Sequence, residues 1–574
     1  MKNTISEQII HELGIVRKTV LDINPSYAPT HTDLLELINL YLNSKYRDSD
    51  KDSEGFKKWF INISDFRCKV MSKAIDLDTK DIRIIAEEGQ SNLPSWFFSK
   101  DIKLFMKEQM FGKFLNEVKN EAPRWGTVVA KKAGDEISVV NLKNLYPDPE
   151  TKYLKWGRFI NEEHEYTPDE LEDVGKKSGW DKIGQAIDLV KKKGEKETPL
   201  IKVYERYGTW EKQLAQSIVV FERIKNTWKE VILSEEAIKP DEIPYKEFHT
   251  DKRIGRWISK GVVENLFENQ IAENETVNFK RKNMHWGSKY LFESADDTIA
   301  SSLLSDAVSG QIFKSEKGIR RIDTREGNLA AYRDEEERWD RNADRKTFSH
   351  DVMRGESLPS GTPLGSARLQ TAQASSYFEG IREDFGIFLK EIFYDWVLPD
   401  FKKKNNKEHI LNFVGSEPAE LEKFDRLVVG YRTNEGLRNF VKKNGKLPMP
   451  NQLEMMKVVE KEKIRDNRFM TIPKNHYNNL KYKMEMVITG ESVDLGSKLH
   501  TLSNALATVA TNPMILANPM TRKMFFRQLD LAGINPAEFE TDVDMQGMMD
   551  MVTKQSGQAK PVITPGPAKE EMKI

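Results

Sequence analysis

Two glycines lie close together in the loop 355–361, an arrangement that also occurs in phosphate-binding P-loops. A P-loop holds phosphates with its backbone amides and with the lysine that directly follows its second glycine. Thr362 stands in the place of that lysine. The loop therefore lacks the positive charge that phosphate binding requires, and the sequence predicts no nucleotide site here.

Three other patterns could carry chemistry, and each is incomplete. The run 147–152 contains the letters of a PD…ExK nuclease site, but its acidic residues are adjacent in a proline-rich turn, whereas a nuclease holds them on separate strands. A zinc-protease helix needs two histidines four residues apart, and neither His11 nor His164 has the second one. The single cysteine, Cys68, excludes disulfides within the chain and multi-cysteine metal sites. We expect a protein that is not an enzyme and that holds no cofactor or metal.

The composition limits the classes of partner. Of 574 residues, 38% are hydrophobic and 31% are charged, and the net charge is only −1, so a globally basic nucleic-acid binder is excluded. Contact with nucleic acid would need local patches or shape. No uncharged apolar stretch approaches the roughly 18 residues that a membrane span needs, and the N-terminus has no apolar signal-peptide core. We therefore expect no membrane partner.

The hydrophobic pattern predicts an α+β fold that is predominantly helical. Residues 1–120 read as helices around a polar loop at 49–54. Residues 121–255 contain the β-branched runs of a hairpin around Gly134 and a helical stretch. The expected strands lie at 127–129, 137–140, 201–207, 218–224 and 231–233, the helical stretch at 167–193, and a turn-rich connector at 240–255.

The middle of the chain predicts two helices that flank a small mixed module. The first helix forms the C-terminal part of the segment 256–283. The module spans 284–326, and the second, more polar helix spans 327–354. Two prolines and two glycines in the loop 355–364 prevent that helix from continuing. A third helix, 365–399, follows; it is on the order of 50 Å long at about 1.5 Å per residue.

This third helix changes character along its length and is expected to stop at Pro399. Its first half is small and polar, whereas its second half, up to Trp396, is apolar at helical spacing. The segment 400–491 then predicts strands at 410–414 and 482–488 and helices at 417–428 and 450–465. Residues 492–553 read as methionine-rich helices, and residues 554–574 lack periodicity and are expected to be disordered.

In this order of elements the chain resembles the portal proteins, or head-to-tail connectors, of tailed bacteriophages, and it looks most like those of crAss-like and podovirus-type phages. Three places carry the resemblance. They are Pro244, Tyr245, Lys246, Glu247 and Phe248 followed by Gly255, Arg256, Gly261, Glu264, Gln270 and Asn274; the loop 358–364 between two helices; and the run 377–386 with Trp396 and Pro399, together with 489–491 leading to Asn512 and Pro513.

The resemblance implies a structural virion protein. Twelve subunits would form a ring at one capsid vertex, surrounded by the major capsid protein, and double-stranded DNA would pass through it during packaging and ejection. The terminase large subunit and later the head–tail adaptor proteins would dock on the ring, which would assemble in the host cytoplasm. Near-zero net charge suits a conduit, because each phosphate contact would add affinity and oppose sliding.

The resemblance also assigns parts and residues by position. The wing would comprise 1–120 at its periphery, 121–255, the long helix 365–399 and 400–491; the stem 256–283 and 327–354; the clip 284–326; the tunnel loop 355–364; and the crown 492–553. The tunnel-loop residues facing DNA would be Glu356, Ser357, Leu358, Pro359, Ser360, Gly361, Thr362 and Pro363. Contacts between neighbouring stems are expected from Arg333, Glu335, Arg338, Arg341 and Arg345, whose exposed ion pairs would contribute about 0 to 1 kcal/mol each.

Two other functions and one simpler interpretation remain open. A packaging enzyme, such as a terminase or nuclease, would need an ATP site or a metal cluster that the motifs do not supply. The chain could also be another structural virion protein, such as a capsid or adaptor subunit. A capsid protein would be expected to form shells and not closed rings. A monomeric globular protein would need the polar helix 327–354 to be exposed to solvent and the long helix to be an ordinary core helix.

Overall fold

The computed structural model describes most of the first 486 residues. The described residues are 4–19, 30–77, 82–86, 92–191, 199–288, 291–293, 317–322, 329–349, 364–405, 409–412, 418–444, 449–465, 469–472, 474, 482–486 and 503. They form an α+β fold in which helix predominates, as predicted, and all of their strand pairs are antiparallel. The chain divides into two compact units, Met1–Met486 and Val487–Ile574. No helix in the described part is long and apolar enough to cross a membrane.

A five-stranded antiparallel sheet has the order β4-β5-β6-β7-β8. Its strands are β4 Leu145–Pro147, β5 Phe159–Tyr166, β6 Ile201–Trp210, β7 Gln213–Ile224 and β8 Thr227–Ala237. The predicted strands at 201–207, 218–224 and 231–233 are confirmed. The helical stretch is two helices, α6 Pro168–Ser178 and α7 Ile183–Val190, because Gly179 has φ +69° and ends α6 in the left-handed conformation.

Helices cover both faces of this sheet. Side chains of α6 and α7, including Leu171 and Ile187, pack on Val203 and Val220. The N-terminal helix α1, Ile5–Lys18, packs on the opposite face with Ile5, Ile9 and Leu13 against Tyr204, Val219 and Phe221. The first helix of the chain therefore belongs to the core of this part of the fold.

A smaller sheet has the order β3-β2-β9. Its strands are β2 Thr127–Ala133, β3 Glu136–Val139 and β9 Tyr245–His249. The predicted hairpin is confirmed, and Gly134, with φ +61°, forms its turn. The prediction that 240–255 is only a connector is wrong, because β9 lies in it. Tyr245 and Phe248, the buried residues of β9, are three apart, so the period of two that marks a half-buried strand is missing.

The other N-terminal elements contact the middle of the chain. The helices are α2 His31–Leu42, α3 Ile63–Ala74, α4 Asn92–Glu108 and α5 Phe111–Trp125. The strand β1, Ile82–Ala86, pairs with β14, Tyr482–Met486. The strand at 482–488 was expected, but β1 was not. Its partner is about 400 residues away in sequence, so no local hairpin signal marks the pair.

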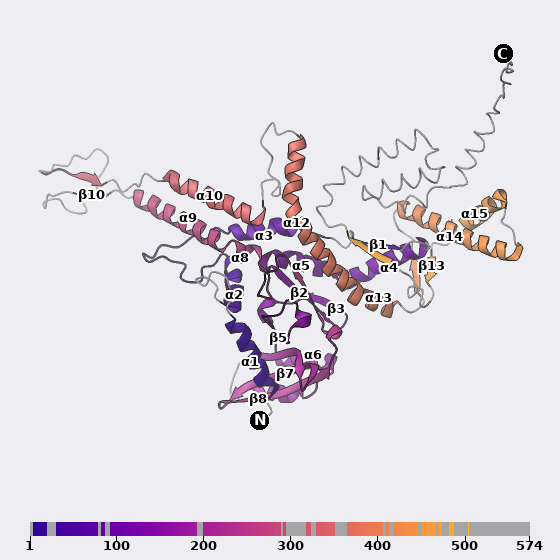
Figure 1. Cartoon of the computed structure of the whole chain (residues 1–574), viewed down its shortest axis with the longest axis horizontal. Helices are drawn as coiled ribbons and strands as arrows, with labels where there is room; N and C mark the ends of the chain where they lie inside the picture. The colour runs from indigo at the N-terminus through magenta and orange to yellow at the C-terminus, as the bar shows by residue number, and fades with distance from the viewer. Residues whose placement is uncertain are drawn as a thin grey trace, which may run out of the picture. The chain divides into compact units, whose positions relative to one another are not determined.

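The predicted order of helix, small module, helix and long helix is present (Figure 1). The elements are α8 Val262–Asn265, α9 Phe267–Gly287, β10 Leu291–Glu293, β11 Arg320–Ile322, α10 Leu329–Thr347 and α12 Leu364–Ile392. The expected end of the second helix near residue 353 is wrong. The helix ends at Thr347 because Phe348 has φ +56°, a left-handed conformation that the α-helix cannot continue through.

The apolar half of α12 is a core helix, as predicted. Phe378, Phe385 and Ile392 are buried, and Phe248 of β9 lies 5.3 Å from Phe385 between ring centroids. The predicted stop at Pro399 is wrong: a π-helical turn, Phe393–Val397, leads into α13, Leu398–Lys404. A proline removes one backbone hydrogen bond and needs space for its ring, and the wider π turn before Pro399 accommodates both effects.

The rest of the described chain contains a helical hairpin and a short strand pair. The elements are α14 Pro418–Asn444, α15 Pro450–Arg465, β12 His409–Asn412 and β13 Phe469–Ile472. The helix predicted at 417–428 is shorter than the observed α14. The observed helix continues past Gly430 and Gly436, because it packs against α15. The expected crown, 492–553, apart from residue 503, and the tail, 554–574, lie outside the described residues, as does most of 284–326.

Candidate functional site

Helices α9 and α10 form an antiparallel pair, visible side by side in Figure 1. The Lys280 ammonium lies 2.8 Å from a Glu336 carboxylate oxygen. The Asn283 side chain donates to the Tyr332 hydroxyl at 2.9 Å. In these contacts the residue numbers increase along α9 and decrease along α10, so the two helices are antiparallel. The contacts also fix the position of one helix along the length of the other.

A buried arginine joins α3 to α10. The Arg67 side chain is 2% exposed, and its guanidinium lies 2.7 Å from carboxylate oxygens of both Asp340 and Asp344. It also donates to the Ile63 carbonyl at 3.1 Å. Arginine is suited to this position because its planar group carries five donors and stays charged when buried. The N-terminal region therefore anchors the second helix of the pair.

Residues 57–63, which are extended up to Asn62 and end on the first residue of α3, lie along α9, and we call this segment the strap. Three amide side chains of α9, four residues apart, accept hydrogen bonds from strap N–H groups. Ile63 N donates to Gln270 Oε1 at 3.1 Å, Ile61 N to Asn274 Oδ1 at 2.8 Å and Trp59 N to Asn278 Oδ1 at 2.7 Å. Four helical residues rise about 6 Å, and two extended residues span about 6.6 Å. The two repeats match, so the strap is held in one register.

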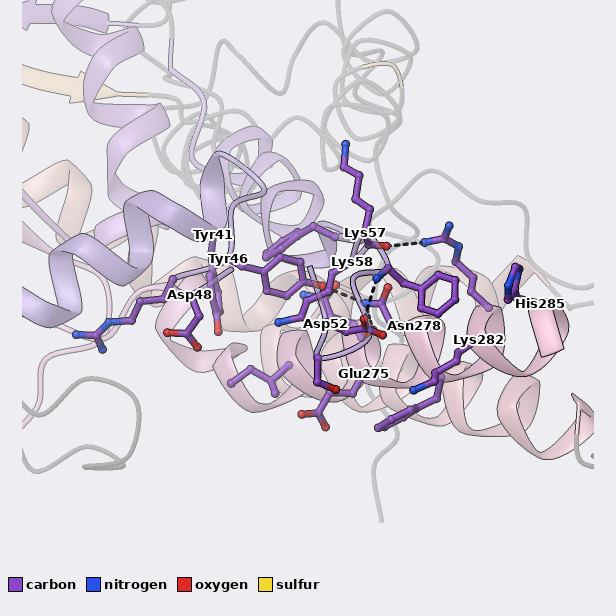
Figure 2. Close-up of a pocket in the computed structure, with 18 of the residues that line it drawn as sticks. Tyr41, Tyr46, Asp48, Asp52, Lys57, Lys58, Glu275, Asn278, Lys282 and His285 are labelled. Atoms are coloured by element: carbon purple, nitrogen blue, oxygen red, sulfur yellow. Dashed lines mark hydrogen bonds between the residues drawn. The ribbon is translucent and has the colours of Figure 1, made fainter. Parts of the chain in front are cut away.

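A groove of about 760 Å³ lies between the loop before the strap and α9 (Figure 2). Its aromatic lining includes Tyr46, which donates from its hydroxyl to the Trp59 carbonyl at 2.7 Å. Five basic residues also line it: Arg47, Lys57, Lys58, Arg281 and Lys282. At the rim, the Arg281 guanidinium lies 3.5 Å from the centre of the Trp59 ring, and Lys282 forms an ion pair with Glu54. The groove combines aromatic surface with carboxylates, including that of Glu275.

A buried glutamate lies between the two helices. Glu273 of α9 is 7% exposed, and its Oε2 atom has no hydrogen-bond partner in the described part of the chain. Burial, together with the nearby carboxylates of Glu336 and Asp340, raises the pKa of Glu273 to about 7, against the opposing effects of Arg67 and Lys280. The folded protein therefore binds a proton here more tightly than the unfolded chain does.

Stability should fall with rising pH because of this group. A carboxyl whose folded pKa is raised contributes stability that is complete below its unfolded pKa and is lost as the pH rises through the folded value. The affected window is about pH 4.5 to 7. We expect Glu273→Gln to raise the free energy of unfolding at pH 8 by about 1 to 2 kcal/mol, with little effect at pH 4.5. Urea unfolding at both pH values measures this, and an equal effect at both would contradict it.

The stem residues expected from the sequence lie on α10. Arg333, Arg338, Arg341 and Arg345 are exposed, and Glu335 is half-buried. The charged atoms of Arg338 and Glu335 are 3.4 Å apart, and those of Arg341 and Glu337 are 3.5 Å apart. Both pairs join residues of one helical turn and contribute little stability. The tunnel-loop residues 356–363 lie outside the described residues.

Sequence reasoning missed a serine–histidine–glutamate arrangement between β9 and α8. Ser259 Oγ lies 2.9 Å from His249 Nδ1, and His249 Nε2 lies 3.2 Å from Glu247 Oε2. Ser259 is fully buried, and the Thr127 hydroxyl lies 3.1 Å from the same histidine nitrogen. Burial lowers the pKa of His249. A substrate carbonyl cannot reach the serine, so the arrangement joins β2, β9 and the chain before α8.

A second cluster has the ligand types of a metal site. The ligand atoms of Glu162, His164 and Glu205 lie within 4.8 Å of one another. The Lys131 ammonium lies 2.5 Å from a carboxylate oxygen of each glutamate. Burial raises the pKa of Glu205, but hydrogen bonds from His164 and Lys131 lower it to about 2. The cluster thus contains its own cation and connects the two sheets.

No protein-family model matches the chain, and no similar sequence is found among curated proteins.

Proposed function

We propose that this protein is the portal protein of a tailed bacteriophage: a ring of twelve subunits through which double-stranded DNA is packaged and ejected. One observation carries the proposal. The antiparallel pair α9 and α10 is interrupted by the strand pair β10–β11 and is followed by the long helix α12. A helix pair with an insertion at one end suits a stem that ends in a docking module for terminase and adaptors.

The surface of α10 also supports assembly. A closed ring repeats one heterologous contact, so each subunit needs two different complementary faces. Exposed arginines follow one side of α10. The groove beside α9 has a lining of mixed charge in which Glu275 supplies a carboxylate next to the aromatic ring of Phe279. The net charge of −1 fits a channel that does not hold phosphates tightly.

Native mass measurement with negative-stain images of the same fraction tests the proposal. Twelve chains of 66.4 kDa would have a mass of roughly 800 kDa. Closed rings with a central hole near this mass are the expected result. A monomer at every concentration, also when co-expressed with capsid and scaffold proteins, would contradict the proposal. Shells would indicate a capsid subunit, and ATP hydrolysis or metal-dependent DNA cleavage would indicate a packaging enzyme.

The tunnel-loop assignment makes a separate prediction. Replacing Pro359 and Gly361 together with alanine removes one proline, which restricts the loop backbone, and one glycine, which gives it freedom. We expect rings of normal mass that package or retain less DNA, because only the loop facing the channel is changed. Ser360→Ala is the matched control and should package normally. Loss of the rings themselves would mean that the loop has a structural role.

A further inference from the structure

Helix α9 presents three different faces. One face, with Asn269, Lys280 and Asn283, contacts α10. A second face holds the strap through its amide ladder. Because a helix advances about 100° per residue, Glu275 and Phe279 fall on a third face, and both are exposed, Phe279 by 58%. The groove in Figure 2 runs between this third face and the strap, on the side of α9 that points away from α10.

The outward face of α10 is a stripe of charge. Tyr332 and Glu336 point toward α9. Asp334, Arg338, Arg341 and Arg345 follow at steps of four, three and four and are all exposed, and at about 100° per residue they lie opposite the α9-facing side. The Arg338 and Arg341 side chains are each 67% exposed. The groove and the stripe therefore lie on opposite sides of the helix pair.

The chemistry of the two sides is complementary. A guanidinium group binds a carboxylate in plane and stacks on aromatic rings. The groove supplies the Glu275 carboxylate beside the exposed ring of Phe279. The same pattern already occurs within the subunit, where Arg281 lies over the ring of Trp59.

The two sides also match in level along the helix pair. Lys280 lies level with Glu336, and the helices are antiparallel with the same rise per residue. Glu275, five residues before Lys280, is therefore level with Arg341, five residues after Glu336. By the same count, Phe279 is level with residue 337, next to Arg338.

We propose that the groove beside α9 of one subunit receives the arginine stripe of α10 from the next subunit, with Arg341 paired to Glu275 and Arg338 stacked on Phe279. Rotation about a ring axis keeps each residue at its own level along that axis. Groups that are level within a subunit therefore meet between subunits whose helix pairs run along the axis. The occupant of the groove is a second copy of this chain. This inference rests on the proposed ring and adds its contact residues.

Charge exchange tests the pairing. Glu275→Arg and Arg341→Glu each place like charges opposite each other. Each should raise the subunit concentration at which half of the chains are in rings by about fivefold. The double variant restores the pair with reversed polarity and should assemble nearly as the wild type does. Glu172→Arg, on α6, is the matched control, because Glu172 is exposed and, within the described part of the chain, its ion pair is with Lys176 of its own helix. All variants should unfold at the wild-type temperature.

Crosslinking tests the geometry independently of affinity. Chains with Glu275→Cys and Arg341→Cys together should form ladders of linked subunits with a short bis-maleimide, whereas either single-cysteine chain should form no linked dimer. Mixing the two single-cysteine chains should give dimers only. Cys68 does not interfere, because it is 3% exposed and burial raises its pKa to about 12.

The outcomes separate this inference from the proposed function. If the wild type forms rings but neither charge reversal changes their assembly, or the double variant fails to recover, the groove binds something other than a second copy, and the inference is wrong while the portal proposal stands. Linked dimers from either single-cysteine chain alone would indicate a two-fold contact and would also overturn it. If the wild type forms no rings, both proposals fail.

Discussion

Replacing Arg67 with methionine is expected to lower the free energy of unfolding by about 3 to 5 kcal/mol. Methionine fills similar space but leaves the Asp344 carboxylate, 8% exposed, without the guanidinium that lies 2.7 Å away. Removing the cation from a buried ion pair costs far more than the pair itself contributes, because the carboxylate stays buried without that compensating charge. Because this pair joins α3 to α10, the loss should also reduce assembly of the ring that we propose. Denaturant unfolding followed by circular dichroism measures the change.

Two variants separate the buried pair from a general effect of charge on α3. Lys69→Met removes the neighbouring ion pair with Asp65, whose lysine side chain is 70% exposed, and should cost no more than about 0.5 kcal/mol. Arg67→Met combined with Asp344→Leu removes both charges and should recover most of the stability. A loss below 1 kcal/mol in Arg67→Met would show that solvent reaches Asp344 and that the pair does not anchor α10.

Replacing Trp396 with alanine is expected to cost about 3 to 5 kcal/mol, the usual range for removing a buried tryptophan. Trp396 is 7% exposed and lies in the π-helical turn after α12. The Lys246 ammonium of β9 lies 5.5 Å from the centre of its ring. Truncation would leave a large cavity where α12, β9 and α13 meet. Thermal and urea unfolding of the variant measure the effect.

Trp156→Ala is the matched control, because the Trp156 side chain is 70% exposed. Its loss should change the free energy of unfolding by no more than about 0.5 kcal/mol. Equal effects of the two substitutions would mean that Trp396 is not a core residue and that the apolar half of the long helix ends before it.

Elements marked by long, regular periodicity could be predicted from the sequence. The hairpin around Gly134 and the strands β6, β7 and β8 were expected and are present. The apolar half of α12 was expected to lie in a core, and it does. Strand β9 and the true end of α10 at Thr347 were missed, because neither a spacing of three in a short strand nor a left-handed Phe348 has a distinctive local signal.

The side-chain clusters could not be predicted from local sequence patterns, because their members are far apart in the chain. Arg67 and Asp344 are 277 residues apart in the chain, and Ser259 reaches Thr127 across 132 residues. The amide ladder is the exception that a search could have found, since Gln270, Asn274 and Asn278 stand four residues apart on one helix. Even so, the sequence does not say which extended segment those amides would bind.

The sequence by itself determined the fold class, the order of the helices around the small module, and the charge pattern of the helix 329–347. The spacing of hydrophobic residues and the distribution of charged residues follow from the sequence alone, so they can be determined without knowledge of tertiary contacts. Only the tertiary structure decided that Glu275 and Phe279 lie in a groove away from α10, with Glu275 level with Arg341, and that Arg67 anchors α10 from the N-terminal region. Those relations depend on which elements, far apart in the sequence, pack against each other and bury their surfaces. Such burial exists only in the assembled fold.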